Sequence, residues 1–342
     1  MSDGIHHRRI VLSARPGKSA TLDCFRLDRV PIEEPRDGEV LLRTVWLSLD
    51  PYMRGRMSEA PSYAPPVAIG QVMTAQTVAR VERSRDTRFS PGEWVLAPGG
   101  WQEYSVSSGA QLVKLPADLK SPSQALGVLG MPGFTAYVGL LDIGCPKPGE
   151  TVVVAAATGA VGSLVGQIAR IKGCRAVGLA GSAEKCAWAL ESLGFDACID
   201  HRSADLAAKL AGACPAGIDV YYENVGGRVF QAVLPLLNAH ARVPVCGLIS
   251  QYDSVPNSAA TDQLPALMRQ ILVKRIAMRG FIISDGFEHR RSEFLDTMSA
   301  WLREGKIIYR EDIVEGLENA PAAFLGLLRG ENFGKLVVRV ST

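Results

Sequence analysis

A glycine-rich turn between an apolar run and a helical segment is the clearest chemical signal in the sequence. Residues 155–162 read Ala-Ala-Ala-Thr-Gly-Ala-Val-Gly, which is the dinucleotide-binding pattern with Ala157 in place of its first glycine. Gly159 lets the backbone approach a pyrophosphate, and Gly162 lets the following helix pack closely on the strand. The residues that we predict to bind the phosphates of a nicotinamide dinucleotide are Gly159, Ala160, Val161 and Gly162.

The end of the next apolar run bears on the choice between NAD and NADP. An NAD site carries an Asp or Glu about 20 residues after the glycines, whereas residues 179–182 read Leu-Ala-Gly-Ser. Ser182 can donate to a 2′-phosphate, Lys185 can pair with its charge, and His201 can join them together with Arg202. These residues favour NADP(H). The alternative is that Ser182 only caps a helix and that Lys185 is a solvated lysine; we expect Glu184 to face solvent.

The segments around this turn alternate between strands and helices. Residues 151–156 are apolar throughout, as in a central parallel strand covered on both faces. A helix is predicted over 161–172 and another over 182–193. Further strands are predicted at 175–179, 197–200, 218–222 and 241–246. This alternation predicts an α/β fold with a doubly wound parallel sheet of the Rossmann type.

The first 120 residues are instead typical of a β domain. Short apolar or alternating runs are separated by Gly and Pro clusters, at 9–12, 40–47, 73–81, 93–97 and 103–106. Ser121 and Pro122 then mark a helix start, as N-cap and first helical residue. Residues 335–340 form a last predicted strand.

Composition limits the class of protein. The chain has 342 residues, enough for about two domains, and a net charge of +2, which argues against a nucleic-acid or membrane-surface binder. No apolar run approaches the ~18 residues of a membrane helix. The seven cysteines are scattered, and no apolar segment follows the basic start of the chain. We therefore expect reduced thiols and a cytoplasmic location.

Six blocks spread over the chain resemble the medium-chain dehydrogenase/reductase superfamily. More narrowly, they resemble its zinc-independent NADPH double-bond reductases, which include leukotriene B4 dehydrogenase/prostaglandin reductases, plant alkenal reductases and bacterial curcumin reductases. The blocks are 48–57 (SLDPYMRGRM), 156–185, 193–202, 221–227 (YYENVGG), 246–253 and 330–340. The resemblance implies a GroES-like β domain formed by residues 1–125 and 313–342. A Rossmann NADP-binding domain, 126–312, would be inserted into it, with the active site between them.

The resemblance also assigns residues to the cofactor and the substrate. It implies that Asn224 and Asn332 hydrogen-bond the cofactor. The residues implied to line its nicotinamide side are Cys246, Gly247, Ser250, Tyr252, Phe281, Ile282 and Ile283. Tyr52, Tyr63 and Tyr252 would line the substrate cleft, with Tyr52 as hydrogen-bond donor. The alternative for each tyrosine is a half-buried packing role. We interpret Cys246 as a packing residue, because no histidine lies near it in sequence to activate a thiol.

The ligands of the zinc-dependent relatives are absent from the sequence. Where those enzymes carry their first ligands, this chain reads Leu-Asp-Pro-Tyr at 49–52, and it reads Gly-Gln-Val at 70–72 in place of Gly-His-Glu. Without a metal to stabilise an alkoxide, reduction of an activated C=C bond is easier than alcohol oxidation. Hydride would reach the β carbon of an enal or enone, and a hydrogen-bond donor would stabilise the resulting enolate.

The predicted function is therefore NADPH-dependent reduction of α,β-unsaturated aldehydes and ketones. The alternatives are a quinone reductase, a non-enzymatic NADPH-binding protein and an allylic alcohol dehydrogenase. His201 stands where leukotriene/prostaglandin-type relatives have a tyrosine, a difference that concerns the contacts to the adenosine phosphate. Their tyrosine near Val273 is absent, which argues against eicosanoid substrates. Residues 279–283 are predicted to form an edge strand that joins two copies in a homodimer.

Overall fold

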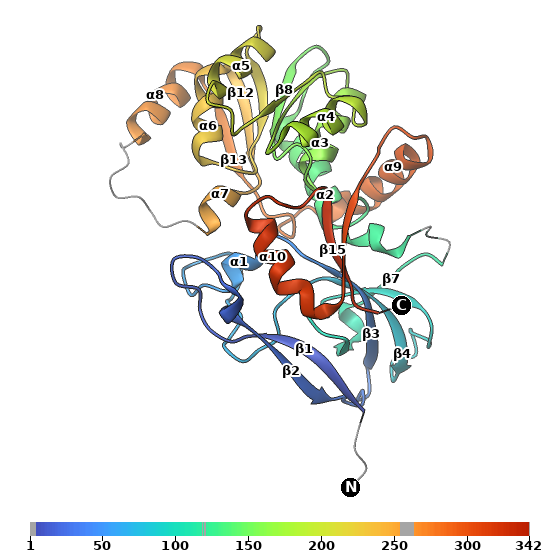
Figure 1. The fold of residues 1–342 in the computed structure, drawn as a ribbon. Coiled ribbons are helices and arrows are strands. Elements are labelled where there is room, and N and C mark those ends of the chain that lie inside the picture. The colour runs from blue at the N-terminus through green and yellow to red at the C-terminus, as the bar shows by residue number, and fades with distance from the viewer. Residues whose placement is uncertain (1–4, 118, 120, 254–262, 342) are drawn as a thin grey trace. The chain divides into compact units, whose positions relative to one another are not determined.

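The chain forms two compact units, each with its own core. The computed structural model describes residues 5–117, 119, 121–253 and 263–341 (Figure 1). The first unit comprises Met1–Gly127, Glu311–Asn332 and Leu336–Thr342, and the second comprises Val128–Arg310 and Phe333–Lys335. The chain thus leaves the first unit, builds the second and returns.

A six-stranded parallel sheet is the centre of the second unit. Its strands are β8 (Thr151–Ala155), β9 (Arg175–Ala180), β10 (Ala197–Asp200), β11 (Ile218–Tyr222), β12 (Leu237–Val245) and β13 (Ala277–Gly280). Their order is β10-β9-β8-β11-β12-β13, and every pairing is parallel. The predicted doubly wound Rossmann sheet is confirmed. The winding reverses between β8 and β11, so their carboxyl ends form the switch point at which such sheets bind ligands.

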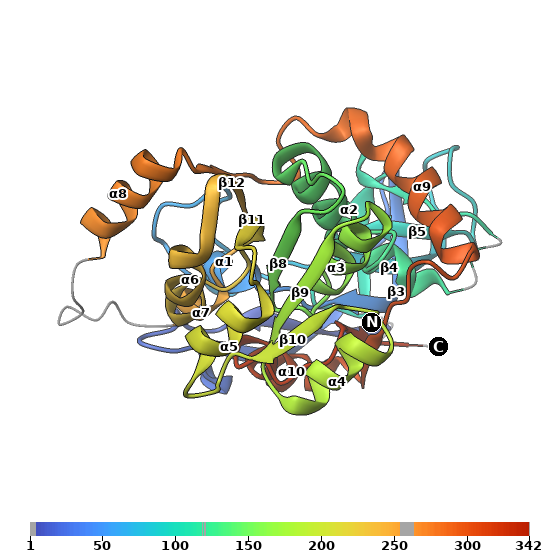
Figure 2. The ribbon, with the colours of Figure 1, turned by 90° about the horizontal axis from the view of Figure 1, so that it is seen from above.

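Helices cover both faces of this sheet. They are α2 (Met131–Val138), α3 (Gly162–Ile171), α4 (Ala183–Glu191), α5 (Leu206–Ala213), α6 (Gly227–Val233), α7 (Ile249–Tyr252), α8 (Leu264–Lys274) and α9 (Arg291–Arg303). Figure 2 shows α2 and α9 on one side of the strands and α5 on the other. No helix in the described ranges is long and apolar enough to span a bilayer.

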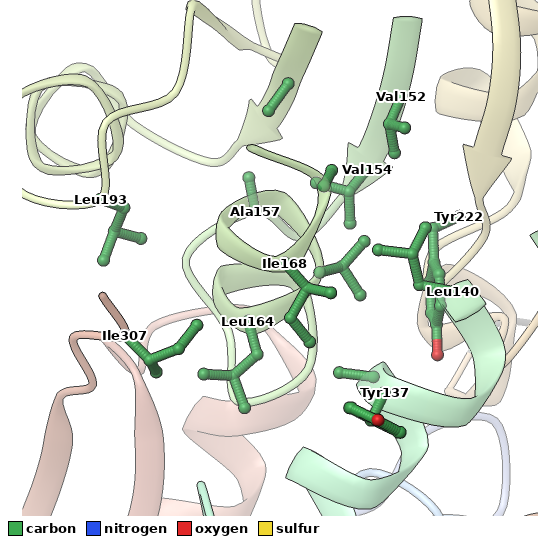
Figure 3. Packing of buried hydrophobic residues seen from close by; sticks show 14 of the residues in the cluster. Tyr137, Leu140, Val152, Val154, Ala157, Leu164, Ile168, Leu193, Tyr222 and Ile307 are labelled. Atoms are coloured by element: carbon green, nitrogen blue, oxygen red, sulfur yellow. The ribbon is translucent and has the colours of Figure 1, made fainter. Parts of the chain in front are cut away.

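The side chains of β8 alternate between the two faces of the sheet, and this explains why helices cover both faces. Val152 and Val154 belong to one apolar cluster, whereas Val153 and Ala155 belong to another. Successive side chains of a strand point to opposite faces, so a strand that is apolar at every position needs a helical layer on each side. Figure 3 shows the first cluster, with Leu164 and Ile168 of α3 among side chains of β8 and α2.

The first unit is mostly antiparallel β structure. Its strands are β1 (His6–Leu12), β2 (Phe25–Pro31), β3 (Glu39–Ser48), β4 (Thr77–Ser84), β5 (Trp94–Ala97), β6 (Tyr104–Ser108), β7 (Val113–Lys114), β14 (Glu311–Glu315) and β15 (Lys335–Arg339). The larger sheet has the order β14-β15-β3-β4-β5-β7 with β6 on β3, and β1 pairs with β2. Two helices complete the unit, α1 (Met53–Arg56) and α10 (Ala320–Leu328).

Aromatic rings fill the core of the first unit. The ring of Phe25 stacks on Trp101 with centroids 5.5 Å apart, and Trp101 meets Phe324 of α10 edge-on at 5.7 Å. Phe324 comes from the part of the chain that returns after the second unit. These ring contacts therefore tie the returning segment to the N-terminal strands.

Several element predictions differ from the structure, and three of the differences have a clear reason. β12 begins four residues before its apolar run at 241, because Leu237 pairs with the start of β11. The edge strand predicted at 279–283 ends at Gly280, since its pairing partner β12 ends at Val245. The helix start predicted at Ser121 is a short 3-10 helix, Pro122–Leu126.

Candidate functional site

The glycine turn lies between β8 and α3, at the switch point of the sheet. The amide of Ala157 donates to Leu179 O at 3.0 Å, and the amide of Gly159 donates to Ala156 O at 2.9 Å. A Cβ at residue 162 would overlap the carbonyl oxygen of Ala156, so no larger side chain fits there without moving the helix. The amides of Ser163 and Leu164 donate to Gly159 O and Val161 O, each at 3.1 Å, so the amides that the start of α3 can offer to an anion are those of Val161 and Gly162. The predicted residues 159–162 thus form a tight turn that can present N–H groups to an anion.

The returning chain lies directly against this turn. Gly159 and Gly334 form a parallel bridge, and the amide of Gly334 donates to Thr158 O at 3.0 Å. The ring of Phe333 meets Trp188 edge-on at 5.1 Å and lies 3.9 Å from the guanidinium of Arg310. Asn332, which the family resemblance implies to bind the cofactor, immediately precedes Phe333 and belongs to the first unit.

Polar and cationic groups gather at the carboxyl ends of β9 and β10. Ser182 Oγ accepts from the backbone amide of Lys185 at 3.2 Å, so Ser182 does cap α4, while its hydroxyl hydrogen remains able to donate. A Cβ on Gly181 would lie 3.2 Å from Nε2 of His201 and 3.8 Å from Nη2 of Arg202. The structure therefore brings Ser182, Lys185 and His201 to one end of the sheet. Glu184 is exposed, as expected.

Two further features of this end concern its charge. Burial lowers the pKa of His201, which favours its neutral form. Arg228 of α6 donates from Nη1 to His201 O at 3.4 Å, and its Nη2 donates to Ser203 O at 2.5 Å. Sequence reasoning missed Arg228, because only the fold brings α6 next to the end of β10.

The segment after β11 is held by a buried carboxylate. Glu223 is 2% exposed, and its Oε1 accepts from Tyr221 Oη at 3.0 Å, Val225 N at 2.6 Å and Gly226 N at 2.8 Å. Burial raises the pKa of Glu223, and its Oε2 is buried with no partner among the described residues. The side chain of Asn224, predicted to bind cofactor, donates from Nδ2 to Ala155 O at 2.8 Å. Glu223 and Asn224 therefore fix the turn beside the end of β8.

Residues 246–252 are hydrogen-bonded to this turn. The amides of Cys246 and Gly247 both donate to Glu223 O, at 2.9 and 3.2 Å. The hydroxyl of Ser250 donates to Val225 O at 2.5 Å. The hydroxyl of Tyr252 accepts from the amide of Leu248 at 3.1 Å, and a Cβ on Gly247 would lie 3.0 Å from it. Tyr252 is thus folded back over Gly247.

A cavity of about 500 Å³ opens beside this segment, within the second unit. Its lining includes five of the predicted residues, namely Cys246, Gly247, Tyr252, Phe281 and Ile282. Arg279 and Asp285 also line it, and sequence reasoning missed both. Ser250 and Ile283 are not among the lining residues; Ile283 packs against the apolar cluster of α2 and α3.

The thiol of Cys246 is unsuited to act as a nucleophile. Burial raises its pKa to about 12, so the thiolate is scarce at neutral pH. The nearby ring of Phe281 meets Tyr222 edge-on at 6.4 Å and Phe287 edge-on at 6.2 Å. Cys246 and Phe281 therefore contribute an apolar wall, consistent with a packing role for the cysteine.

Tyr52 and Tyr63 belong to the first unit. Tyr52 is half-buried, precedes α1 and packs against the apolar cluster that contains Met53 and Met57. Burial, with a further contribution from Asp50, raises its pKa, so the phenol stays protonated. Tyr63 is 59% exposed to solvent. Among the described residues, no three His, Cys, Asp or Glu side chains are grouped so as to hold a metal ion.

Comparison with known proteins identifies the family. A model for the N-terminal domain of oxidoreductases matches residues 8–115, and a zinc-binding dehydrogenase model matches residues 160–300. The chain is 59% identical over 335 residues to the NADPH-dependent curcumin reductase of Escherichia coli (strain K12), covering 98% of this chain and 97% of that protein. The chain belongs to the zinc-independent double-bond reductases of the medium-chain dehydrogenase/reductase superfamily.

Other double-bond reductases agree with this placement. The NADP⁺-dependent 2-alkenal reductase of Nicotiana tabacum is 42% identical over 307 residues, which cover 89% of this chain and 88% of the relative. The crystal structure of CurA from Vibrio vulnificus in complex with NADPH has a TM-score of 0.95 and 58% identity, with 98% of this chain and 99% of that chain covered. These reductases share the fold and nearly the whole length of the chain.

Proposed function

We propose that this double-bond reductase uses NADPH to reduce the C=C bond of α,β-unsaturated aldehydes and ketones. The observation that carries the proposal is the glycine turn at Gly162, closed to any side chain, followed by a strand end that has Ser182 and Lys185 in place of an acidic residue. The high identity to curcumin and alkenal reductases supports the same substrate class.

The residues of the second unit fit this cofactor. A Cβ at residue 162 would overlap Ala156 O, so the helix lies close to the turn, and Lys185, Arg202 and Arg228 supply positive charge at the adenosine end. When bound, NADPH supplies the hydride. The turn at 159–162 would hold its pyrophosphate, and Ser182, Lys185 and His201 would surround its 2′-phosphate. We accordingly assign residues 126–312 as the NADP-binding domain, and 1–125 with 313–342 as the substrate domain.

The chemistry of the chain's own residues follows from where charge develops. As hydride reaches the β carbon of the substrate, negative charge grows on its carbonyl oxygen, which needs a donor. Tyr52 would donate that hydrogen bond, since its raised pKa keeps the hydroxyl proton in place. Tyr252 would border the substrate from the cavity wall and Tyr63 from the first unit. The residues that would position the nicotinamide are Asn224, Asn332, Cys246, Gly247, Ser250 and 281–283.

We also propose a homodimer located in the cytoplasm. β13 is an edge strand, and Ala277, Arg279 and Gly280 on it are exposed. Pairing with a second copy would satisfy its unpaired backbone groups. All seven cysteines are free thiols, which is consistent with a reducing compartment.

A substrate panel tests the proposal. NADPH oxidation is measured with enals, enones and quinones, and repeated with NADH. We expect turnover of enals and enones, and a KM for NADPH well below that for NADH. Lys185→Ala should raise the KM for NADPH about tenfold or more, as for loss of one charge-assisted hydrogen bond, and leave that for NADH unchanged. Lys172→Ala, at the end of α3, is the matched control.

The panel also separates the alternatives. Quinone turnover with no enone turnover would favour the quinone reductase. NADPH binding without turnover of any electrophile would favour a non-enzymatic protein.

A further inference from the structure

Arg228 lies in the first turn of α6 and reaches the loop that joins β10 to α5. Its Nη1 donates to His201 O at 3.4 Å, and its Nη2 donates to Ser203 O at 2.5 Å and to Ala204 O at 3.5 Å. Three carbonyl oxygens of one loop thus accept from one guanidinium. A guanidinium suits this arrangement because it is planar and its N–H groups point in fixed directions.

The backbone that carries Arg228 is itself held in place. Gly226 and Gly227, which precede it, have φ angles of 75° and 54°, a region that favours glycine. The carboxylate of Glu223 accepts from the amides of Val225 and Gly226, at 2.6 and 2.8 Å. Arg228 therefore extends from a turn that is fixed to the end of β11.

The loop uses its own amides to form its turn. The amide of His201 donates to Ala180 O at 2.9 Å, and that of Ser203 donates to Asp200 O at 3.0 Å. The amide of Arg202 donates to Asp200 Oδ1 at 2.8 Å. The outer carbonyl groups of the loop accept from Arg228, so this side chain connects the loop to a second strand end, that of β11.

The side chains of the loop lie at the end of β9. A Cβ on Gly181 would lie 3.2 Å from Nε2 of His201 and 3.8 Å from Nη2 of Arg202. Gly181 precedes Ser182, the N-cap of α4. The shape of the loop thus decides where His201 and Arg202 lie relative to the strand end at which we place the 2′-phosphate.

We infer that Arg228 is a positioning residue that favours NADPH over NADH, an inference that rests on the proposed function. It holds the loop so that His201 and Arg202 face the 2′-phosphate. Without this guanidinium the loop has more conformations, and binding of NADPH must order it at a cost in affinity. NADH carries no 2′-phosphate, so its affinity does not depend on that order.

The first measurement compares Arg228→Gln with the unaltered full chain. We expect the KM for NADPH to rise about tenfold, as for loss of one charge-assisted hydrogen bond. The KM for NADH and kcat at saturating NADPH should stay unchanged. An unchanged KM for NADPH would overturn the inference.

Arg175→Gln is the matched control. Arg175 is an exposed arginine of the same unit and donates from Nε to a backbone carbonyl, Ala213 O, at 3.1 Å. It begins β9, so it lies at the opposite end of that strand from Gly181. This variant should keep the KM for NADPH of the unaltered chain.

A double-variant cycle separates positioning from direct contact between Arg228 and the phosphate. Arg228→Gln is introduced into a chain that already carries His201→Gln and Arg202→Gln. We expect no further rise in the KM for NADPH, because Arg228 acts through those two side chains. The same rise in both backgrounds would show direct contact and would overturn the positioning role.

Hydrogen exchange followed by mass spectrometry supplies a measurement that needs no cofactor. The amides of 201–203 are hydrogen-bonded, and we expect them to exchange faster in Arg228→Gln than in the unaltered chain or in Arg175→Gln. Equal exchange in all three would overturn the inference. Equal KM values for NADPH and NADH in the unaltered chain would contradict the proposed function instead, whatever the exchange rates.

Discussion

Tyr52 combines two properties that a donor to a developing enolate needs. It is half-buried beside Met53, and its raised pKa keeps the proton on the phenol. We predict that Tyr52→Phe lowers kcat by about 10²- to 10³-fold, the usual effect of removing one donor to a developing oxyanion, and leaves NADPH affinity unchanged. Stopped-flow reduction of an enone and NADPH fluorescence titration measure the two quantities.

A control separates this effect from a general loss of structure. Tyr104→Phe removes a hydroxyl from β6 of the same unit and should leave kcat unchanged. A Tyr52→Phe enzyme with full turnover would exclude Tyr52 as the donor.

His201 makes stability depend on pH. Its pKa in the folded chain lies below 6.5 because the half-buried ring is partly removed from water. The unfolded chain therefore binds a proton more readily, so the contribution of His201 is fully present above about pH 6.5 and is lost as pH falls through the lower, folded pKa. We predict that the free energy of unfolding of the wild type falls more steeply between pH 6.5 and 5 than that of His201→Gln. Urea titrations across this range measure it, and identical slopes would contradict the assignment.

At the scale of elements, the joint between β8 and α3 depends on one glycine. A Cβ at Gly162 would overlap the Ala156 carbonyl, so Gly162→Ala must push the helix away from the turn. We predict a loss of NADPH affinity of more than tenfold and a lower melting temperature. Gly212→Ala in α5 is the matched control, because nothing lies within 4 Å of its Cβ position, and it should gain about 0.5–1 kcal/mol of stability. Equal affinities in the two variants would contradict a phosphate site at this turn.

Sequence patterns predicted the elements best where burial is continuous. The bounds of β11 match its predicted range, and those of β8 differ from theirs by one residue, since an apolar run marks a strand covered on both faces. β2 was not predicted, because its residues 25–31 mix charged and apolar side chains and, in the described part of the chain, it pairs with β1 alone. Whether such a segment forms a strand depends on its pairing with a neighbouring strand rather than on its local sequence pattern.

The same reasoning explains which candidate residues sequence could supply. Ser182 and Lys185 follow a recognisable strand end, so their place is readable from spacing alone. Phe333 and Glu223 carry no such signal. Phe333 contacts Trp188 although it lies 145 residues later in the chain. Glu223 accepts hydrogen bonds from backbone amides of its own turn. Arg279 and Asp285 enter the cavity only because β13 ends beside it.

At the scale of the whole molecule, binding of a cofactor to the second unit couples to stability. A ligand that binds only the folded chain adds about 2.7 kcal/mol when present at ~100 times its Kd, which for a unit of this size corresponds to a melting-temperature increase of about 5–10 °C. Ser182, Lys185 and the turn at 159–162 all belong to the second unit. We therefore predict that NADPH raises the melting temperature of the second unit by this amount, and that NADH at the same concentration raises this melting temperature much less. Differential scanning calorimetry measures both increases. Lys185→Ala should bring the NADPH increase down to that of NADH, since only the 2′-phosphate distinguishes the two ligands. Equal increases in the unaltered chain would show that this end of the sheet does not recognise the phosphate.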